Sequence, residues 1–159
     1  MFEVGDTVVY PPHGAGVVVE SPESDGQRML TIRIAHNNLT LSVPDSAAAE
    51  RGVRPAITSE QIDALLAGLT DEAEELKETA QLRTRAAADV ERSGDPVRLA
   101  ATIRDYAARQ RDGAKLTAPE RKVLETARRI LATEIALVRS IPIDEAEALL
   151  DSSLGIEPA

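Results

Sequence analysis

The hydrophobic pattern of this chain changes its period near residue 58, and this change constrains the fold more than any other feature. In residues 29–35 and 39–43, apolar and polar side chains alternate, which is typical of half-buried strands. From Ser59 onward, apolar residues recur every three to four positions, which is typical of amphipathic helices. We therefore expect an α+β protein in which a β-module is followed by an all-α helical bundle.

Four short strands fit into the first 45 residues. Thr7–Tyr10 and Val17–Glu20 flank a Pro-Pro-His-Gly-Ala-Gly turn, in which proline ends the first strand and the glycines permit a tight reversal. Met29–Ala35 and Leu39–Val43 follow, separated by the turn His36-Asn37-Asn38. Short strands joined by short turns predict a small β-barrel of the Tudor or SH3 type. We place this module at residues 1–52, a linker at 53–58 and the helical domain at 59–159.

The helical half carries the start and stop signals of five helices. Hydroxyl or carboxylate side chains stand where an N-cap is needed, and one forms a capping box with a glutamate three residues later. The acidic segment after Thr70 suits the first turn of a helix. The predicted starts are Ser59, Thr70, Asp95-Pro96 and Thr117 (boxed with Glu120), the stops are Ser93-Gly94, Gly113 and Pro142, and the last helix spans Glu145–Leu154.

Composition limits the chemistry that is open to this chain. It has 159 residues, no cysteine and only three aromatic residues, so its core must consist of Val, Ile, Leu and Ala. The lack of cysteine excludes disulfides and thiolate metal sites. No apolar run approaches the ~18 residues of a membrane span, and no signal-peptide pattern is present. We expect a cytoplasmic monomer with no membrane contact.

The net charge of −9 disfavours whole-molecule attraction to nucleic acid, but the charge is unevenly distributed. Residues 59–78 carry seven acids against one base, whereas residues 83–129 carry twelve bases against seven acids. The second stretch could form a phosphate-binding face. It could equally form solvated helix faces with i,i+4 ion pairs, and the sequence leaves both interpretations open.

The sequence offers no constellation of residues for catalysis. His13 and His36 both fall in predicted turns, and the carboxylates lie on predicted solvent faces of helices. The chain contains no HExxH motif, no nucleophile elbow and no phosphate-binding glycine loop. We therefore expect neither enzymatic activity nor a cofactor nor a metal site.

Several runs, from the first strand to the longest helix, carry a family resemblance in their order and spacing. These runs are Val4–Pro11 with His13-Gly14, Leu39–Leu41, Val43-Pro44, Ser93–Asp95, Ile103–Asp105, Leu116–Ala118, Glu120–Lys122 and Ala127–Leu131. They resemble the CarD family (CarD/CdnL) of bacterial transcription regulators. The resemblance implies a Tudor-like domain that docks on the RNA polymerase β subunit. It also implies a helical domain that contacts promoter DNA at the upstream edge of the melted bubble, and hence a nucleoid-associated protein.

The resemblance also assigns two sets of site residues. The first lies on the strand that the family turns toward the polymerase and on its neighbour, and the second lies where the family contacts DNA. The polymerase-binding set is Arg33, Leu39, Thr40, Leu41, Ser42 and Val43, and the DNA-binding set is Ala80, Gln81, Arg83, Arg85, Arg121 and Lys122.

Three departures from the family pattern concern contact residues. The family inserts a tryptophan into the minor groove beside the unpaired bases, but this chain has no tryptophan, and the slot falls near Ala80 or Gln81. Ser42 stands where familiar members carry an arginine that faces polymerase. The turn before Met29 is short and carries Glu23 and Asp25 where a basic residue is expected.

We therefore predict a non-enzymatic regulator that docks on polymerase and reaches DNA through phosphate contacts, with weak or absent wedge activity. The alternative is a protein–protein adaptor whose acidic helical half binds something other than promoter DNA. An antagonist that competes with a fuller family member for the β subunit is compatible with the first prediction.

Overall fold

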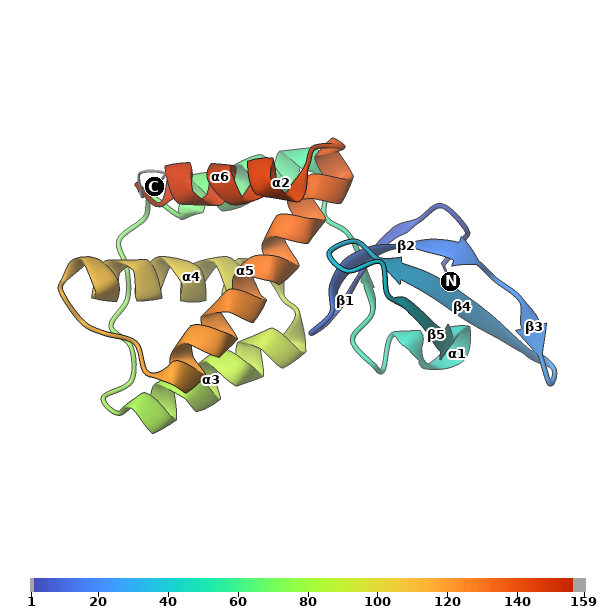
Figure 1. Ribbon diagram of the computed structural model, residues 1–159, viewed down its shortest axis with the longest axis horizontal. Coiled ribbons are helices and arrows are strands. Elements are labelled where there is room, and N and C mark those ends of the chain that lie inside the picture. The colour runs from blue at the N-terminus through green and yellow to red at the C-terminus, as the bar shows by residue number, and fades with distance from the viewer. Residues whose placement is uncertain (1, 156–159) are drawn as a thin grey trace.

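The structure is a computed structural model that describes residues 2–155, and it has a β-module followed by helices, as expected of an α+β protein (Figure 1). The strands are β1 (Thr7–Tyr10), β2 (Gly14–Glu20), β3 (Glu23–Ser24), β4 (Gln27–Ile34), β5 (Thr40–Pro44) and β6 (Arg54–Pro55). The helices are α1 (Asp45–Ala48), α2 (Ser59–Gly68), α3 (Ala80–Ser93), α4 (Pro96–Arg111), α5 (Ala118–Arg139) and α6 (Ile143–Ser153).

The strands form one bent antiparallel sheet in the order β3-β4-β2-β1-β6, with β5 paired to β4. Alternate side chains point inward and are removed from water, which is the main favourable contribution to folding of such a small module. Its core has no aromatic side chain at full burial, as the composition predicts. The fully buried residues are Val8, Val18, Leu30, Ile32, Ile34 and Val43.

The reversal between β1 and β2 depends on two glycines. Gly14 has a φ of +99°, a conformation that side chains rarely adopt. A Cβ on Gly16 would lie 2.5 Å from the carbonyl oxygen of Arg33, so β2 and β4 could not approach as closely with any other residue there. β2 begins at Gly14, three residues before the predicted Val17, because its pairing with β1 extends to Tyr10.

The predicted linker at residues 53–58 is partly a strand. Arg54 and Pro55 form β6, which pairs with Val9 and Val8 of β1 at the edge of the sheet. Two residues are too few to show a hydrophobic period, so the sequence pattern could not reveal this strand. The chain therefore enters the helical half directly from the sheet.

The helix predicted to start at Thr70 is wrong in its first ten residues. α3 begins at Ala80, with Thr79 as its N-cap, and the acidic segment 72–79 is not helical. Carboxylates four residues apart, such as Glu74 and Glu78, repel one another on a helix. The segment is instead held by tertiary bonds: the backbone N–H of Glu74 donates to Asp105 Oδ1 at 3.0 Å.

The other helix signals act as predicted, with small shifts. Asp95 caps α4, and Thr117 with Glu120 forms the capping box of α5. The N-cap of α2 is Thr58 rather than Ser59, again in a capping box. α6 begins at Ile143, two residues before the predicted start. No helix of residues 2–155 is long and apolar enough to span a membrane.

α5 is the central element of the helical half and also its contact with the sheet (Figure 1). It packs against α3, α4 and α6, and Ile130, Leu131 and Ile135 are buried in the largest apolar core of the molecule. The same helix packs against β1 and β2. α5 therefore sets the relative orientation of the two halves.

The junction between the halves is a buried polar network. Glu134 of α5 is fully buried, and its two carboxylate oxygens accept hydrogen bonds from Arg54 at 2.7 and 2.8 Å. The backbone N–H of Ile57 donates to the same carboxylate at 2.8 Å, and Arg54 Nε donates to the carbonyl of Gly94. Such bidentate pairs fix geometry as well as charge. The strand β6 is thereby tied to α5 and to the α3–α4 turn.

Candidate functional site

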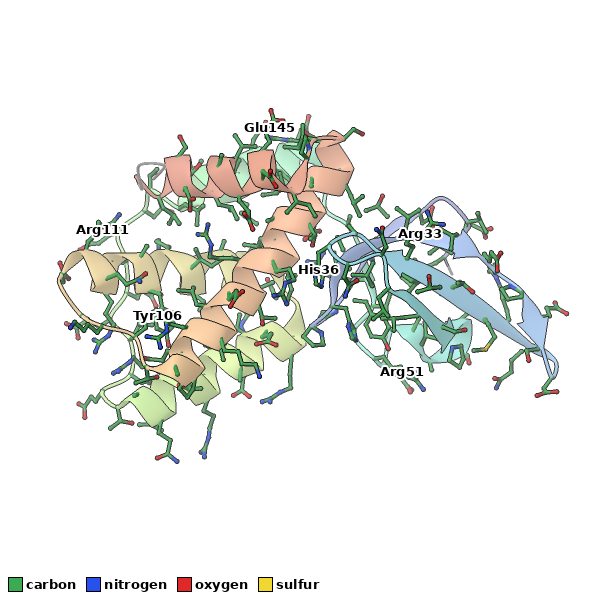
Figure 2. The ribbon with its side chains drawn as sticks, in the orientation of Figure 1. Arg33, His36, Arg51, Tyr106, Arg111 and Glu145 are labelled. Atoms are coloured by element: carbon green, nitrogen blue, oxygen red, sulfur yellow. The ribbon has the colours of Figure 1, made fainter. Side chains whose placement is uncertain are left out.

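β5 forms an edge of the sheet. Within residues 2–155 its only strand partner is β4, with Thr40 opposite Arg33. Arg33, Thr40 and Ser42 are exposed, and Leu39, just before the strand, is an exposed large apolar side chain (Figure 2 labels Arg33). An edge of this kind can accept a strand from another chain through its backbone.

Two members of the predicted polymerase-binding set are not free on this edge. Val43 has 0% exposure and its side chain belongs to the core of the β-module, so the prediction that this side chain faces a partner is wrong. Leu41 is half-buried and packs against the same core. The cause is strand alternation, because residues 41 and 43 point to the opposite side from residues 40 and 42.

The turn that departs from the family pattern is acidic on its surface. Glu23 and Asp25 are exposed, and Asp25 with Gly26 forms the tip of the β3–β4 hairpin. The nearby Arg28 is engaged within the module: its guanidinium donates to Ser21 Oγ at 2.5 Å and to the carbonyl of Phe2. It also faces Asp45 at 3.4 Å. Arg28 therefore stabilises the β-module through contacts within it and is not a free cation on the surface of the module.

In the helical half, the tryptophan slot lies in the first turn of α3. Ala80 is the first residue of that helix and is half-buried, and Gln81 is exposed beside it. Both border a shallow groove between α3 and the start of α5, which Thr84, Arg85, Ala88 and Pro119 also line. The position suits a wedge, but neither side chain has the flat apolar area that insertion between bases requires.

The assignment of Arg83 to phosphate binding is wrong. Arg83 is only 7% exposed, and its Nε donates to Glu120 Oε1 at 2.5 Å. Its other donors hold the carbonyls of Lys77 and Glu78, each at 3.1 Å. Arg83 faces the bundle interior because the carboxylate of the α5 capping box turns inward there. The position of Arg83 on α3, next to Leu82 and near Arg85, could not reveal Glu120 as its partner, because Glu120 lies 37 residues away in the sequence.

Burial and the contact between Arg83 and Glu120 shift the pKa values of Glu120 and Tyr106. Burial alone would raise the pKa of Glu120, but hydrogen bonds from Thr117 and Arg83 outweigh it and hold that pKa below its ordinary value. Burial and the charge of Glu120 raise the pKa of Tyr106 to about 12. The Tyr106 hydroxyl lies 3.4 Å from Glu120 Oε1. This cluster is structural, since it is enclosed by α3, α4 and α5.

The remaining predicted cations are on the surface. Arg85 on α3 and Arg121 and Lys122 on α5 are exposed, and Arg121 donates to the carbonyl of Leu116 at 3.0 Å. Two further cations, Arg92 and Arg129, belong to the same side. Burial raises the pKa of Glu91 on α3, and the charges of Arg92, Arg129 and Lys122 act in the opposite direction. The predicted set lacked Arg92 and Arg129 because the family resemblance assigned neither of them a contact with DNA.

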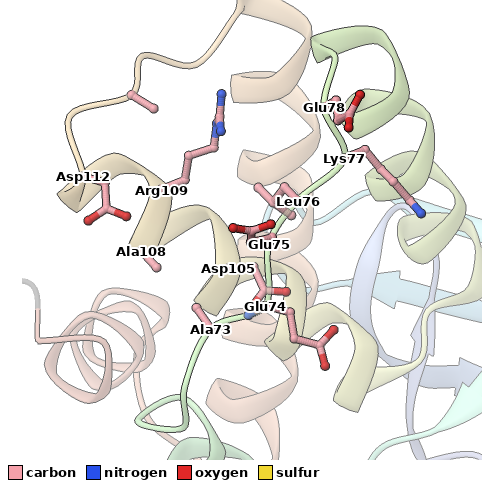
Figure 3. A pocket seen from close by; sticks show the side chains of 11 residues that line it. Ala73, Glu74, Glu75, Leu76, Lys77, Glu78, Asp105, Ala108, Arg109 and Asp112 are labelled. Atoms are coloured by element: carbon pink, nitrogen blue, oxygen red, sulfur yellow. The ribbon is translucent and has the colours of Figure 1, made fainter.

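A hollow on the α4 side has the opposite character. Figure 3 shows it between the acidic segment and α4, where Glu74, Glu75, Glu78, Asp105 and Asp112 contribute to its lining. Arg109 and Lys77 are the bases among the lining residues. No group of three or more carboxylates or histidines in the described part of the chain is placed to hold a metal ion. A phosphate would be repelled here. The exposed cations of the predicted set, Arg85, Arg121 and Lys122, lie instead on α3 and α5.

The comparisons with known proteins agree with this architecture. Residues 2–57 match the family model "CarD-like/TRCF RID domain", and residues 64–151, more than half of the chain, match "CarD, C-terminal domain". The chain belongs to the CarD family. It is also similar to the "Putative transcription factor YdeB" of Bacillus subtilis (strain 168), with 28% identity over 149 residues, covering 89% of this chain and 94% of that protein.

The CarD-family match confirms the resemblance inferred from the opening run. The RID match extends through β6, and the C-terminal match contains all of α3, α4 and α5. The two candidate surfaces, the β5 edge and the α3–α5 face, thus lie in separate matched regions of one CarD-family chain.

Proposed function

We propose that this protein is a non-enzymatic transcription regulator that docks on the β subunit of RNA polymerase and approaches promoter DNA near the upstream edge of the bubble. One observation carries the proposal: a free sheet edge and a basic helical face are held in fixed relation by the Arg54–Glu134 junction. The RID-type domain and the similarity to a putative transcription factor support the same role.

The β5 edge is the proposed polymerase contact. Backbone groups of Thr40–Val43 would pair with a strand of the β subunit, and Arg33, Leu39, Thr40 and Ser42 would add side-chain contacts. Leu41 contributes only its half-exposed surface. Because Ser42 cannot form the charge-assisted bonds of an arginine, docking is weaker than in members that carry one.

The α3–α5 face is the proposed DNA contact. Arg85, Arg121 and Lys122 would neutralise backbone phosphates, each contact adding about one unit to the slope of log affinity against log salt. Ala80 and Gln81 lie at the wedge position without providing a wedge. The protein therefore holds DNA in position but stabilises the open complex weakly.

Restoring the missing arginine tests docking. We expect Ser42→Arg to tighten binding of the full chain to purified polymerase about tenfold, as a new charged hydrogen bond allows. Ser24→Arg is the matched control, since Ser24 is an exposed serine of β3 at the other end of the module. Equal effects of the two variants would contradict docking through the β5 edge.

Restoring the wedge tests the DNA contact. We expect Ala80→Trp to lengthen the lifetime of the open complex about tenfold, because an inserted ring offsets the cost of unstacking a base step. Ala67→Trp, on the exposed face of α2, is the control. An unchanged lifetime with Ala80→Trp would show that the start of α3 does not face the bubble.

Antagonism is the second candidate, and the loss of the wedge favours it. A member that occupies the β subunit without a wedge would displace a member that has one. In competition at equal concentration, the wild-type chain is expected to shorten open complexes formed with a tryptophan-bearing relative. If it leaves them unchanged while binding polymerase, antagonism is excluded.

A further inference from the structure

The two histidines of the chain lie at the same end of the sheet, beside α5. His13 precedes Gly14 in the β1–β2 turn, and His36 follows β4. The β2–β4 register pairs Gly16 with Ile34 and continues through a hydrogen bond from Ala35 N to Ala15 O at 3.0 Å. His36 directly follows this last bond, so it lies at the end of the sheet where the turn carrying His13 begins β2.

Arg129 of α5 lies against the same turn. The backbone of Ala15 donates to Thr133 Oγ1 at 2.9 Å, and a Cβ on Gly14 would lie 3.9 Å from the carbonyl of Arg129. Figure 2 shows His36 at this junction, between the sheet and α5. Three potentially cationic residues from three segments, His13, His36 and Arg129, therefore lie near one short stretch of backbone, residues 13–15.

We propose that His13, His36 and Arg129 bind one backbone phosphate of the DNA. The proposal rests on the DNA contact proposed above and extends it toward the base of the docking module. Arg129 supplies a permanent charge, and the imidazoles donate hydrogen bonds and gain protons when the phosphate binds.

The groups around His13, His36 and Arg129 suit an anion that binds together with the DNA. Burial and the positive charges of Arg129 and His13 lower the pKa of His36, so an anion at this site would oppose that effect. His13 also faces the ring of Tyr10, with centroids 5.3 Å apart. The acidic groups nearby are Glu125, 3.9 Å from Arg129 and largely exposed, and the half-buried Glu91 of α3. Neither of these two carboxylates blocks the access of a phosphate to the site.

The site is also continuous with the α3–α5 face. Lys122 and Arg129 both belong to α5 and stand about two helical turns apart, so they lie on the same side of that helix. Positive charge therefore extends along this side of α5 from Lys122 to Arg129 at the junction with the sheet. A duplex that follows this side of α5 would bring a phosphate to the junction.

The first test uses inorganic sulfate, whose charge is constant between pH 5 and 8. Two imidazole signals can be assigned in the full chain by His13→Gln and His36→Gln and followed by NMR. Relative to chloride at equal ionic strength, sulfate should raise the pKa of His36 by about half a unit. Arg129→Gln should abolish this rise, and Arg51→Gln, an exposed arginine of the β-module away from the junction, should not. Equal pKa values in sulfate and chloride would overturn the anion site.

The second test uses a mixed-sequence duplex. Binding should tighten about tenfold from pH 7.5 to pH 5.5, and the double variant His13→Gln/His36→Gln should lose this gain and about one unit of salt slope at the lower pH. If the duplex binds but the double variant keeps both, the phosphate assignment is wrong and the proposed function stands. If sulfate binds but no duplex does, the DNA contact of the proposed function fails, and DNA is excluded as the ligand of this site.

Discussion

Within residues 2–155, two arginines each pair with a fully buried glutamate, and the two pairs hold different kinds of structure together. Arg54–Glu134 joins a strand of the sheet to α5, two elements that are already regular. Arg83–Glu120 joins α3 to α5 and, through the carbonyls of Lys77 and Glu78, holds a segment that has no regular structure. The same chemistry therefore fixes orientation at one site and local order at the other.

The largest effect is expected at the junction. Glu134→Ala leaves Arg54 without its carboxylate and the N–H of Ile57 without its acceptor, both in a buried setting. We expect the free energy of unfolding in urea to fall by about 3–5 kcal/mol. Glu125→Ala, on the exposed side of the same helix, should change it by less than about 0.5 kcal/mol. Similar losses in both variants would show that the junction is not held by this pair.

Breaking the second pair, Arg83–Glu120, should lower both the stability of the protein and the local order of residues 74–79. Arg83→Met leaves Glu120 buried without its cation, and we expect a loss of about 3 kcal/mol. In addition, hydrogen exchange should accelerate across residues 74–79, because two carbonyls of that segment lose their donor. Arg85→Met, two residues further on the exposed face, is the control. If the segment stays protected in Arg83→Met, the ordering role is wrong.

Alkaline pH should selectively lower the stability contributed by the cluster of Arg83, Glu120 and Tyr106. Because the folded state holds the pKa of Tyr106 at about 12, above its ordinary value of 10, the folded state binds the proton more tightly than the unfolded state. Its contribution, about 2–3 kcal/mol at most, is complete below pH 10 and is lost as pH rises from 10 to 12. Tyrosinate absorbance of the folded protein should show a late titration near pH 12, and Tyr106→Phe should remove it. A folded protein without this late titration would contradict the prediction.

The smallest effects are expected at the helix starts beside each pair. Thr58→Ala and Thr117→Ala each remove an N-cap hydroxyl, next to the junction and next to Glu120, respectively. Each should cost about 1 kcal/mol of unfolding free energy. Thr126→Ala, within α5 and bonded only to a carbonyl of its own helix, should cost less than about 0.5 kcal/mol. A larger loss at Thr126 would reverse this ranking.

Features that depend on neighbouring residues could be predicted from the sequence. The Asp95-Pro96 start of α4 and the Thr117–Glu120 box of α5 act within one turn, so their signals are complete in the local sequence. The alternation of β4 and β5 likewise predicted two strands. The same alternation predicts that the Val43 side chain points inward, because Leu30, which lies opposite Val43 in the β4–β5 register, also points inward.

Features that depend on distant partners could not. The acidic segment was predicted to be helical from its local pattern, which cannot show the carbonyl contacts of Arg83 or the Asp105 contact that hold it in a non-helical form. Arg54 was predicted to lie in a linker because its partner Glu134 is 80 residues away. The two histidines were predicted to be unrelated turn residues, and only the pairing of β2 with β4 brings their turns to one end of the sheet.

The turn between α3 and α4 sits directly against the proline turn of the sheet. A Cβ on Gly94 would lie 2.3 Å from Pro11 Cγ, so the two most recognisable motifs of the chain, Tyr10–Gly14 and Ser93–Asp95, fit each other at van der Waals distance. The halves of this protein are therefore not interchangeable parts. A chimera that combines its sheet with the helices of a relative would fold as one body only if the relative also leaves room for that proline ring.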